Sequence, residues 1–495
     1  MTEIRRAFLW ASVGRYLVMT VNLAAAAVMA RLLTPDEYGI SVLGGAVFAV
    51  AEAIRALGGG AYLIQKRELT SDDVRSSFTV SLAVTIVLTV ALVLLSGPLT
   101  RYFVTPDLGR YIKAATLGFL TGPFVYPISA LMSRQLAFGT IALIGVVTAT
   151  INAAASIWLA SLGFSFMSFA WASAISAIAG MLLYLYAWND SSIFRTRVRG
   201  CRSVIAFGAY DSATAVLYQV AETLPYFIFG RLLNVEAVGL CQRAVTLSLF
   251  PERVILAGVG AVALPALARQ VRESGSLRQG YFRAIELITA ALWPALILLA
   301  LLASPVVTVL LGRQWQEVAP LVEILALALL FSFPASLHYP VMVAAGSIRY
   351  MPPVVVLQSV VSLGILIVAA RQGLRAAAFS MLLIVPLNSL LSLLLVRFVV
   401  GFHWIDLAYA VRNSAACAAL SAVGPVIVAL ATRRLPDMPL AMAALATLLA
   451  ACGWFGGLWL TRHPLLDEVI GVAAAARARL AVVRLDLVVA RLRGD

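Results

Sequence analysis

The segment RLLTPDEYGI at residues 31–40 decides how the rest of the chain is interpreted, because a similar segment, RLLNVEAVGL, occurs at residues 231–240. The same offset of 200 residues aligns Glu52 with Glu252. A repeat of this length indicates that the chain contains two copies of one folding unit.

Each copy of this segment is predicted to form a tight corner between two helices. Thr34 is suited to cap the second helix, and Glu37 completes a T-x-x-E capping box three residues later. Asn234 occupies the same position in the second copy and is also a favourable N-cap residue. Arg31 and Arg231 end the preceding helices, where a cation meets the negative end of the helix dipole.

The composition is that of a membrane protein. Of 495 residues, 62% are hydrophobic and only 12% are charged, whereas soluble domains carry roughly 25% charged residues. The net charge of +14 comes almost entirely from arginine, since Lys66 and Lys113 are the only lysines. These arginines separate apolar segments, which favours a role in membrane topology over nucleic-acid binding. The four cysteines lack metal-binding spacing, so we expect no metal and no cofactor.

The apolar segments predict about fourteen transmembrane helices, because a bilayer crossing needs ~20 mainly apolar residues. The predicted spans are 9–32, 38–62, 77–99, 112–132, 140–161, 165–187, 205–231, 237–262, 284–311, 318–345, 351–370, 375–396, 409–431 and 440–461. With the N-terminus inside, most lysine and arginine residues fall in the inner connections, which predicts that both termini are cytoplasmic.

The domain organisation follows from the repeat. We expect an N-terminal lobe of six spans at 1–187, a basic cytoplasmic linker at 188–204 and a C-terminal lobe of six spans at 205–396. Six spans separate the two corners, so both copies have the same orientation and the repeat is parallel. Two extra spans occupy 397–461, and residues 462–495 are predicted to form a basic amphipathic tail on the inner leaflet.

Two segments resemble the Wzx-type polysaccharide flippases of the multidrug/oligosaccharidyl-lipid/polysaccharide exporter superfamily. They are ARLLTPDEYG at 30–39 and LGGGAYLIQKRELTSDDVRSSF at 57–78. The resemblance implies a V-shaped all-α transporter that opens alternately to either face of the cell inner membrane. The implied substrate is an oligosaccharide repeat unit on an undecaprenyl-pyrophosphate-type lipid carrier, used in exopolysaccharide, capsule or O-antigen synthesis. Implied partners are membrane lipids and other polysaccharide-assembly proteins, and not nucleic acid.

Charged groups within the spans are the candidates for binding such a substrate, since an ionisable side chain in the bilayer is costly unless it is paired or hydrated. Arg15 and Asn22 lie seven residues apart and share one helix face. Arg55 and Arg243 lie in later spans, and arginine suits pyrophosphate because its planar fork binds two oxygens. Lipid II flippases of the superfamily likewise place cavity arginines on the first helices, which supports Arg15 and Arg55. The alternative is that these arginines only extend to the headgroups or pair with acids such as Glu52.

Asp211 and Glu222 are the candidates for coupling transport to an ion gradient. Their offset of eleven residues places both on one face of a helix, together with Tyr218. The equivalent positions of the first copy are Ala11 and Asn22, so the acids are specific to the second copy.

Two other functions remain open. A cation-coupled multidrug exporter of the same superfamily is one, although its cavity would favour acids and aromatics over arginines. A membrane glycosyltransferase or polysaccharide polymerase is less favoured, because the longest outward connection is only about 100–111. The chain also lacks a His/Asp/Glu constellation suited to catalysis, so we expect a transporter and not an enzyme.

Overall fold

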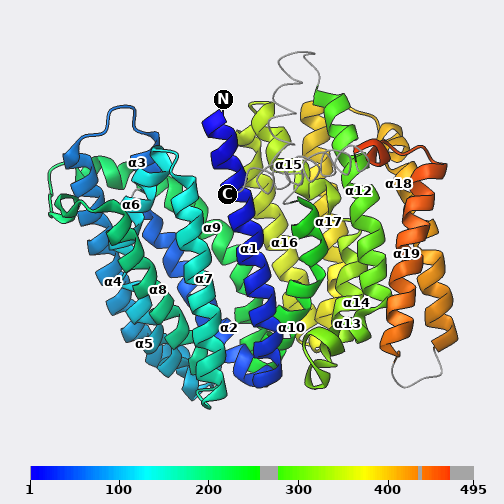
Figure 1. Cartoon of the computed structure of the whole chain (residues 1–495), viewed down its shortest axis with the longest axis horizontal. Helices are drawn as coiled ribbons and strands as arrows, with labels where there is room; N and C mark the ends of the chain where they lie inside the picture. Colours follow the sequence, from blue (N-terminus) through cyan, green and yellow to red (C-terminus); the bar gives the residue numbers. More distant parts are fainter. Residues whose placement is uncertain (1, 59, 257–276, 433–437, 469–495) are drawn as a thin grey trace, which may run out of the picture. The chain divides into compact units, whose positions relative to one another are not determined.

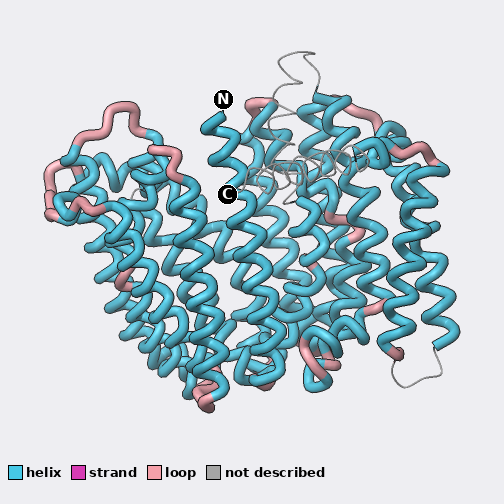
Figure 2. The backbone as a smooth tube through the Cα atoms, viewed as in Figure 1, coloured by secondary structure: helices cyan, strands magenta, loops and turns pink. Residues whose placement is uncertain are grey.

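The computed structural model describes residues 2–58, 60–256, 277–432 and 438–468. These residues are almost entirely helical and contain no strand (Figure 2). The all-α prediction is therefore confirmed. The predicted tail at 462–495 lies largely outside the described residues.

The helices follow one another with short connections (Figure 1). Before residue 257 they are α1 (Thr2–Leu32), α2 (Pro35–Arg55), η1 (Ala56–Gly58), α3 (Gly60–Gln65), α4 (Ser71–Phe103), α5 (Pro106–Phe119), α6 (Gly122–Arg134), α7 (Phe138–Ser161), α8 (Met167–Trp188), η2 (Ser191–Phe194), α9 (Cys201–Leu232) and α10 (Val235–Ser248). After residue 276 they are α12 (Leu277–Leu301), α13 (Ala303–Leu310), η3 (Arg313–Trp315), α14 (Val318–Leu329), α15 (Phe333–Ala344), η4 (Ile348–Tyr350), α16 (Met351–Ala370), α17 (Leu374–Val400), α18 (Trp404–Thr432) and α19 (Leu440–Leu460).

The chain is a multi-pass membrane protein by the length and composition of its helices. Ten helical segments in the described part are long and apolar enough to cross a bilayer, and twelve if two bent helix pairs each count as one span. The predicted spans 205–231 and 237–262 are not among them. Helix α9 covers the first of these, and the second runs past residue 256 into undescribed residues. The count of fourteen therefore stays a prediction.

The order of elements is repeated along the chain. Helices α5 and α6 form a pair bent by 45°, and α14 and α15, at the corresponding place in the second repeat, form a pair bent by 47°. The second helix of each pair has a proline in its first turn, Pro123 in α6 and Pro334 in α15. Proline suits this position because its missing N–H would have no helical partner there.

The chain divides into two compact units. The first consists of Met1–Arg243, Thr308–Glu317 and Ile367–Leu374. The second consists of Ala244–Val307, Val318–Leu366 and Arg375–Asp495. The lobe boundaries predicted from the repeat remain a prediction.

The α1–α2 corner has the predicted capping box. The Thr34 hydroxyl accepts a hydrogen bond from the Glu37 backbone N–H at 3.4 Å, and the Glu37 carboxylate accepts one from the Thr34 N–H at 2.9 Å. At the α9–α10 corner, the Asn234 side chain accepts from the Ala237 N–H at 2.8 Å. Both N-cap predictions are confirmed. Arg31 lies in the last turn of α1, and its guanidinium donates to the Val309 carbonyl at 2.9 Å.

The two corners contact each other reciprocally within the first unit. A β-carbon on Gly39 would lie 2.0 Å from the carbonyl oxygen of Val235, and one on Gly239 would lie 2.2 Å from that of Pro35. Both distances are too short for any side chain. Because Pro35 and Val235 are equivalent positions of the repeat, each copy presents the same surface to the other, and glycine is required in both.

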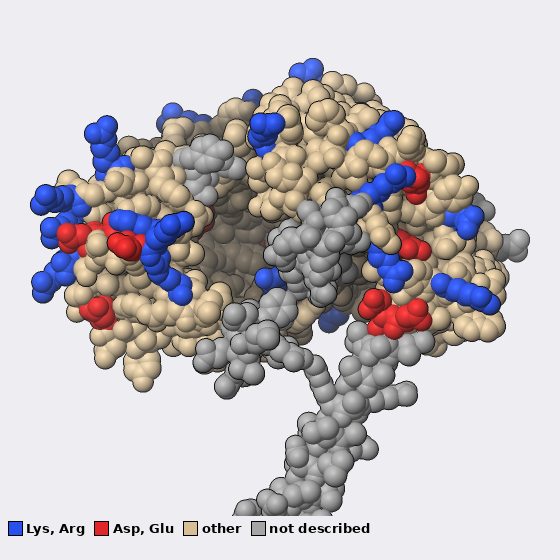
Figure 3. Space-filling model, turned by 90° about the horizontal axis from the view of Figure 1, so that it is seen from above, with Lys and Arg blue, Asp and Glu red and all other residues tan. Residues whose placement is uncertain are grey.

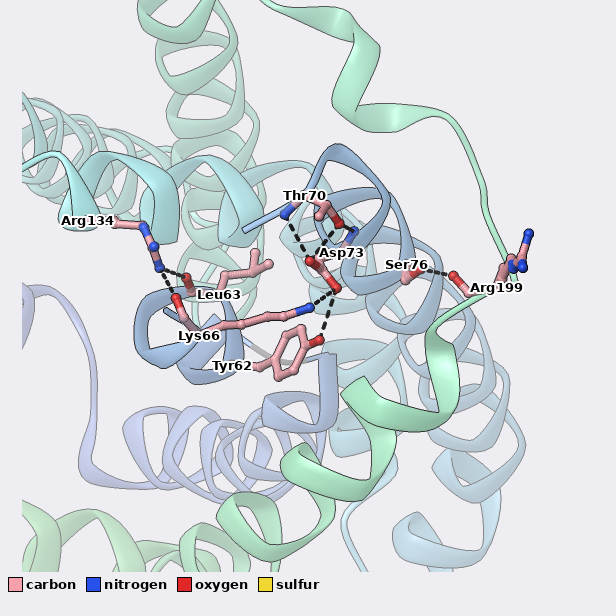
Figure 4. A network of polar contacts seen from close by, with 8 residues as sticks. All are labelled: Tyr62, Leu63, Lys66, Thr70, Asp73, Ser76, Arg134 and Arg199. Carbon is pink, nitrogen blue, oxygen red and sulfur yellow. Dashed lines mark hydrogen bonds and ion pairs between the residues drawn. The ribbon is translucent and has the colours of Figure 1, made fainter. Parts of the chain in front are cut away.

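A polar network fixes the connection between α3 and α4 (Figure 4). The Asp73 carboxylate accepts hydrogen bonds from Lys66 at 2.6 Å, Tyr62 at 3.0 Å and the Thr70 hydroxyl at 2.7 Å. The hydrogen bond to Asp73 raises the pKa of Lys66 above its ordinary value. The Arg134 guanidinium donates to carbonyl oxygens in the last turn of α3 and just after it, those of Leu63, Lys66 and Arg67. One arginine thus satisfies several groups left free at a helix C-terminus.

The linker at 188–204 is held against the start of α4. Arg197 forms an ion pair with Asp72 at 3.0 Å, and its backbone N–H donates to the Thr79 hydroxyl at 2.8 Å. The Ser76 hydroxyl donates to the Arg199 carbonyl at 2.8 Å. Figure 3 shows this end of the unit from above, at the left of the view, with acidic side chains surrounded by lysine and arginine.

Candidate functional site

All six predicted site residues belong to the first unit. Among the residues that the structure describes, no hydrogen bond or ion pair joins any two of them. Their surroundings differ, however, and the differences decide which of them are available to a ligand.

Arg15 and Asn22 have accessible side chains on α1. Both are exposed, and they lie on one helix face, as their spacing predicts. Helix α1 packs against α7 on another side. Within the described part of the chain, the Arg15 guanidinium has no hydrogen-bond or ion-pair partner. It is therefore free to bind an anion.

Arg55 is buried within the first unit, and its two terminal guanidinium nitrogens are engaged while its Nε atom has no hydrogen-bond partner. Its side chain is 7% exposed and forms the predicted ion pair with Glu52, so that prediction is confirmed. It also donates to the Phe119 carbonyl at 2.7 Å and to the Tyr126 hydroxyl at 2.8 Å. The guanidinium carbon lies 4.1 Å from the centre of the Phe119 ring. A charged group with this many partners is held in one orientation.

One partner of Arg55, the Phe119 carbonyl, lies at the break between α5 and α6, which the sequence analysis did not predict. At this break the Phe119 carbonyl accepts the hydrogen bond from Arg55. A β-carbon on Gly122 would lie 2.1 Å from an Arg55 nitrogen, so glycine makes room for the guanidinium. The sequence signal is Thr121-Gly122-Pro123 inside the predicted span 112–132, since Gly-Pro interrupts a helix.

Arg243 is buried against two aromatic rings, Tyr38 and Trp315, which also contact each other edge-on. Its side chain is only 4% exposed, and its guanidinium carbon lies 3.8 Å from the centre of the Tyr38 ring and 5.4 Å from that of Trp315. Among the described residues it forms no hydrogen bond and no ion pair, and its Nε atom lacks a partner. Cation–π attraction is therefore its main compensation. Trp315 is itself fixed, because its ring N–H donates to the Ala30 carbonyl at 2.6 Å.

Glu222 and Tyr218 are both exposed on α9. Their spacing of four residues places them on one helix face, as predicted. The side chain of Asp211 lies outside the described part, so its relation to Glu222 stays a prediction.

The equivalent glutamates of the two repeats, Glu52 and Glu252, have different partners. Glu252, equivalent to Glu52, accepts a hydrogen bond from the Ser336 hydroxyl of α15 at 2.9 Å. Ile255 occupies the position equivalent to Arg55, so the second copy lacks that cation. Nearby on α15, His338 is buried with its Nε2 atom unpartnered. Among the described residues no three His, Cys, Asp or Glu side chains form a group that could hold a metal ion.

Comparison with known sequences places this chain beside polysaccharide-assembly proteins. A family model described as polysaccharide biosynthesis protein matches residues 28–320. The lipopolysaccharide biosynthesis protein WzxC of Escherichia coli (strain K12) is 22% identical over 64% of this chain and 65% of its own length. The succinoglycan biosynthesis transport protein ExoT of Rhizobium meliloti (strain 1021) is 23% identical over 80% of this chain and 78% of its own length. The match to WzxC thus spans slightly less than two-thirds of that protein.

Solved transporter structures have the same fold. The lipid II flippase MurJ in an inward closed conformation superposes with a TM-score of 0.73 at 11% identity, covering 92% of this chain and 100% of MurJ. An inward-facing multidrug resistance MATE family transporter gives a TM-score of 0.61 at 16% identity, covering 79% of this chain and 98% of the transporter. At these identities the similarity establishes the fold alone.

Proposed function

Because this chain belongs to the polysaccharide biosynthesis protein family, we propose that it is a flippase that moves a lipid-linked oligosaccharide repeat unit across the cell inner membrane. One observation carries the proposal: the family match at 28–320 includes both copies of the corner, at 31–40 and 231–240. The relatives are named for lipopolysaccharide and succinoglycan biosynthesis, and ExoT is named a transport protein. The protein acts as a transporter and not as an enzyme.

The proposed substrate is a glycan on an undecaprenyl-pyrophosphate-type carrier. Its pyrophosphate requires cations in a hydrated cavity, and Arg15 is the predicted arginine with an exposed, unengaged guanidinium. Asn22 offers the sugar a hydrogen-bonding side chain on the same face. Arg55 and Arg243 bind substrate only in a conformation in which they give up their present partners.

Transport is proposed to proceed by alternating access, with coupling to an ion gradient at Asp211 and Glu222. Loss of either carboxylate would uncouple transport without abolishing lipid binding. Both termini are proposed to be cytoplasmic, as the distribution of arginine predicts. A reporter fused at residue 195 should therefore report the inside, and one at residue 433 the outside.

A cation-coupled multidrug exporter is the second candidate, because the chain shares its fold with a MATE transporter. The two functions differ in what accumulates when the protein is absent. A flippase deletion accumulates a lipid-linked oligosaccharide at the inner face of the membrane, whereas an exporter deletion sensitises cells to drugs.

The test is complementation of a deletion strain at matched protein abundance. We expect Arg15→Ala to reduce polysaccharide export by ~10–100-fold, the value of one charge-assisted hydrogen bond. Arg15→Lys should restore export only in part, because it keeps the charge and loses the fork. Arg195→Ala, which removes an exposed linker arginine, is the control. Drug sensitivity without accumulation of a lipid-linked sugar would replace the proposal with the exporter.

A further inference from the structure

Helices α12 and α18 pack against each other in the second unit and frame an open cavity of about 800 Å³ at their first turns. An ion pair between Arg278 and Asp406, with atoms 2.6 Å apart, joins the two helices at this level. In the described part of the chain the cavity is lined by Arg278, Phe282, Arg283, Glu286, Asp406 and Tyr409, among others. Figure 3 shows acidic and basic side chains mixed on this side of the face, at the right of the view.

Two charges of opposite sign remain available in this cavity. Arg283 is exposed and has no hydrogen-bond or ion-pair partner among the described residues. One turn further along α12, the Glu286 carboxylate lies 3.8 Å from the Nε2 atom of His463. Arg278 and Asp406, by contrast, neutralise each other. The free pair therefore consists of one guanidinium and one carboxylate, three residues apart on one helix face.

His463 does not neutralise Glu286. Its Nδ1 atom accepts a hydrogen bond from the Leu465 N–H at 3.1 Å, so the ring proton is assigned to Nε2, which faces Ser414 at 3.3 Å. Burial lowers the pKa of His463 below its ordinary value, and Arg283 lowers it further. The imidazole is therefore neutral at pH 7 and serves as a hydrogen-bond donor.

The residues that line the cavity are of the kinds expected at the level of lipid headgroups. Helices α12 and α18 are both apolar enough to span the bilayer, and the lining charges belong to their first three turns. Tyr409 is 62% exposed and Trp404, which begins α18, is 40% exposed. Tyrosine and tryptophan concentrate at the membrane–water interface. A ligand in this cavity thus meets water on one side and acyl chains on the other.

We propose that this cavity binds the zwitterionic headgroup of a phospholipid with a primary amine, phosphatidylethanolamine. Arg283 binds the phosphate, since a guanidinium offers two parallel donors to phosphate oxygens. Glu286 accepts hydrogen bonds from the ammonium group, and Phe282 and Tyr409 contact the glycerol and the upper acyl chains. A purely anionic lipid satisfies Arg283 but places no cation beside Glu286. A choline headgroup carries the cation but has no N–H to donate.

Native mass spectrometry of the full chain in detergent tests the assignment, with phosphatidylethanolamine, phosphatidylglycerol and phosphatidylcholine of identical acyl chains. The wild-type chain should prefer phosphatidylethanolamine. Arg283→Ala should weaken that binding by ~10–100-fold, whereas Arg195→Ala should leave it unchanged. Glu286→Gln should remove the preference over phosphatidylglycerol while phosphatidylglycerol binding persists.

Three results would overturn the proposal. The first is equal or tighter binding of phosphatidylglycerol or phosphatidylcholine to the wild-type chain, a measurement that needs no variant to fold. The second is unchanged phosphatidylethanolamine binding by Arg283→Ala. The third is equal affinity for soluble glycerophosphoethanolamine, which would identify a free metabolite and not a lipid as the ligand. None of these depends on polysaccharide export, so the proposal stands or falls separately from the flippase function.

Discussion

Gly39 lies against the backbone that begins the helix of Gly239, and Gly239 lies in the same way against the backbone that begins the helix of Gly39. Neither residue can carry a side chain without displacing the opposite helix. The two copies of the repeat are therefore fixed to each other at their most similar segment, and the first prediction follows from that contact.

Replacing Gly39 or Gly239 with leucine should reduce the amount of folded protein several-fold. The added side chain would clash with backbone atoms, which cannot move aside as a flexible side chain can. Gly45→Leu is the matched control: it lies on the same helix, and nothing lies within 4 Å of its β-carbon position. Fluorescence-detected size-exclusion chromatography measures the folded fraction. Normal abundance of the Gly39 and Gly239 variants would contradict a structural role for the contact.

Arg55 and Arg15 should differ in their effect on stability. Arg55→Ala removes the cation that pairs with Glu52, which keeps only its hydrogen bond from Tyr126, and removes the donors for Phe119 and Tyr126, so we expect a loss of about 1–3 kcal/mol of unfolding free energy. Arg15→Ala, at an exposed position, should change it by less than about 0.5 kcal/mol. Thermal unfolding in detergent compares the two. Equal losses of unfolding free energy in the two variants would show that the burial of Arg55 does not make it more important for stability than Arg15.

Arg134 should be required for the connection between α3 and α4. Alanine at this position leaves several carbonyl oxygens without a donor, and we expect faster proteolysis of the segment 63–70 as well as a lower melting temperature. Arg134→Lys should restore the wild-type resistance to proteolysis only in part, because a single ammonium cannot reach the same set of carbonyl oxygens. Limited proteolysis followed by mass mapping is the measurement. Cleavage of Arg134→Ala at the wild-type rate would mean that the hydrogen bonds around Asp73 are enough to hold the connection between α3 and α4 in place.

Stability should decrease in mild acid because of His463. The folded state lowers the pKa of this histidine, so below its ordinary value of 6.5 the unfolded chain takes up a proton that the folded chain resists. The contribution of His463 is complete above about pH 6.5 and is lost as the pH falls. His463→Gln should flatten the melting-temperature profile between about pH 7 and 5. An unchanged profile for His463→Gln would contradict this role of the histidine.

Local features of the fold could be predicted from the sequence with good accuracy. The capping residues Thr34 and Asn234 and the pair Glu52–Arg55 all depend on contacts within three residues, for which spacing along the chain is sufficient. The repeat was equally accessible, since it requires only a comparison of the chain with itself.

Contacts between distant segments could not be predicted in this way. The packing of Arg243 against Tyr38 and Trp315 joins three segments whose relative rotation no periodicity determines. For the same reason, the sequence identified Arg55 as a suspect cation without revealing that the break after Phe119 supplies its acceptor. A uniformly apolar span has no polar face, so its sequence does not determine which side of the helix faces a cavity, a neighbouring helix or lipid.

The break between α5 and α6 also has a consequence for biosynthesis. Phe119 follows Arg55 by 64 residues, and translation proceeds at roughly 5–20 residues per second, so the acceptor for Arg55 emerges about 3–13 s after the guanidinium itself. During that delay Glu52, on the same helix, is already present to compensate the charge. We infer that the Glu52–Arg55 pair lets the nascent helix enter the bilayer in a nearly neutral form, and that the later contact with Phe119 completes an arrangement begun at the translocon.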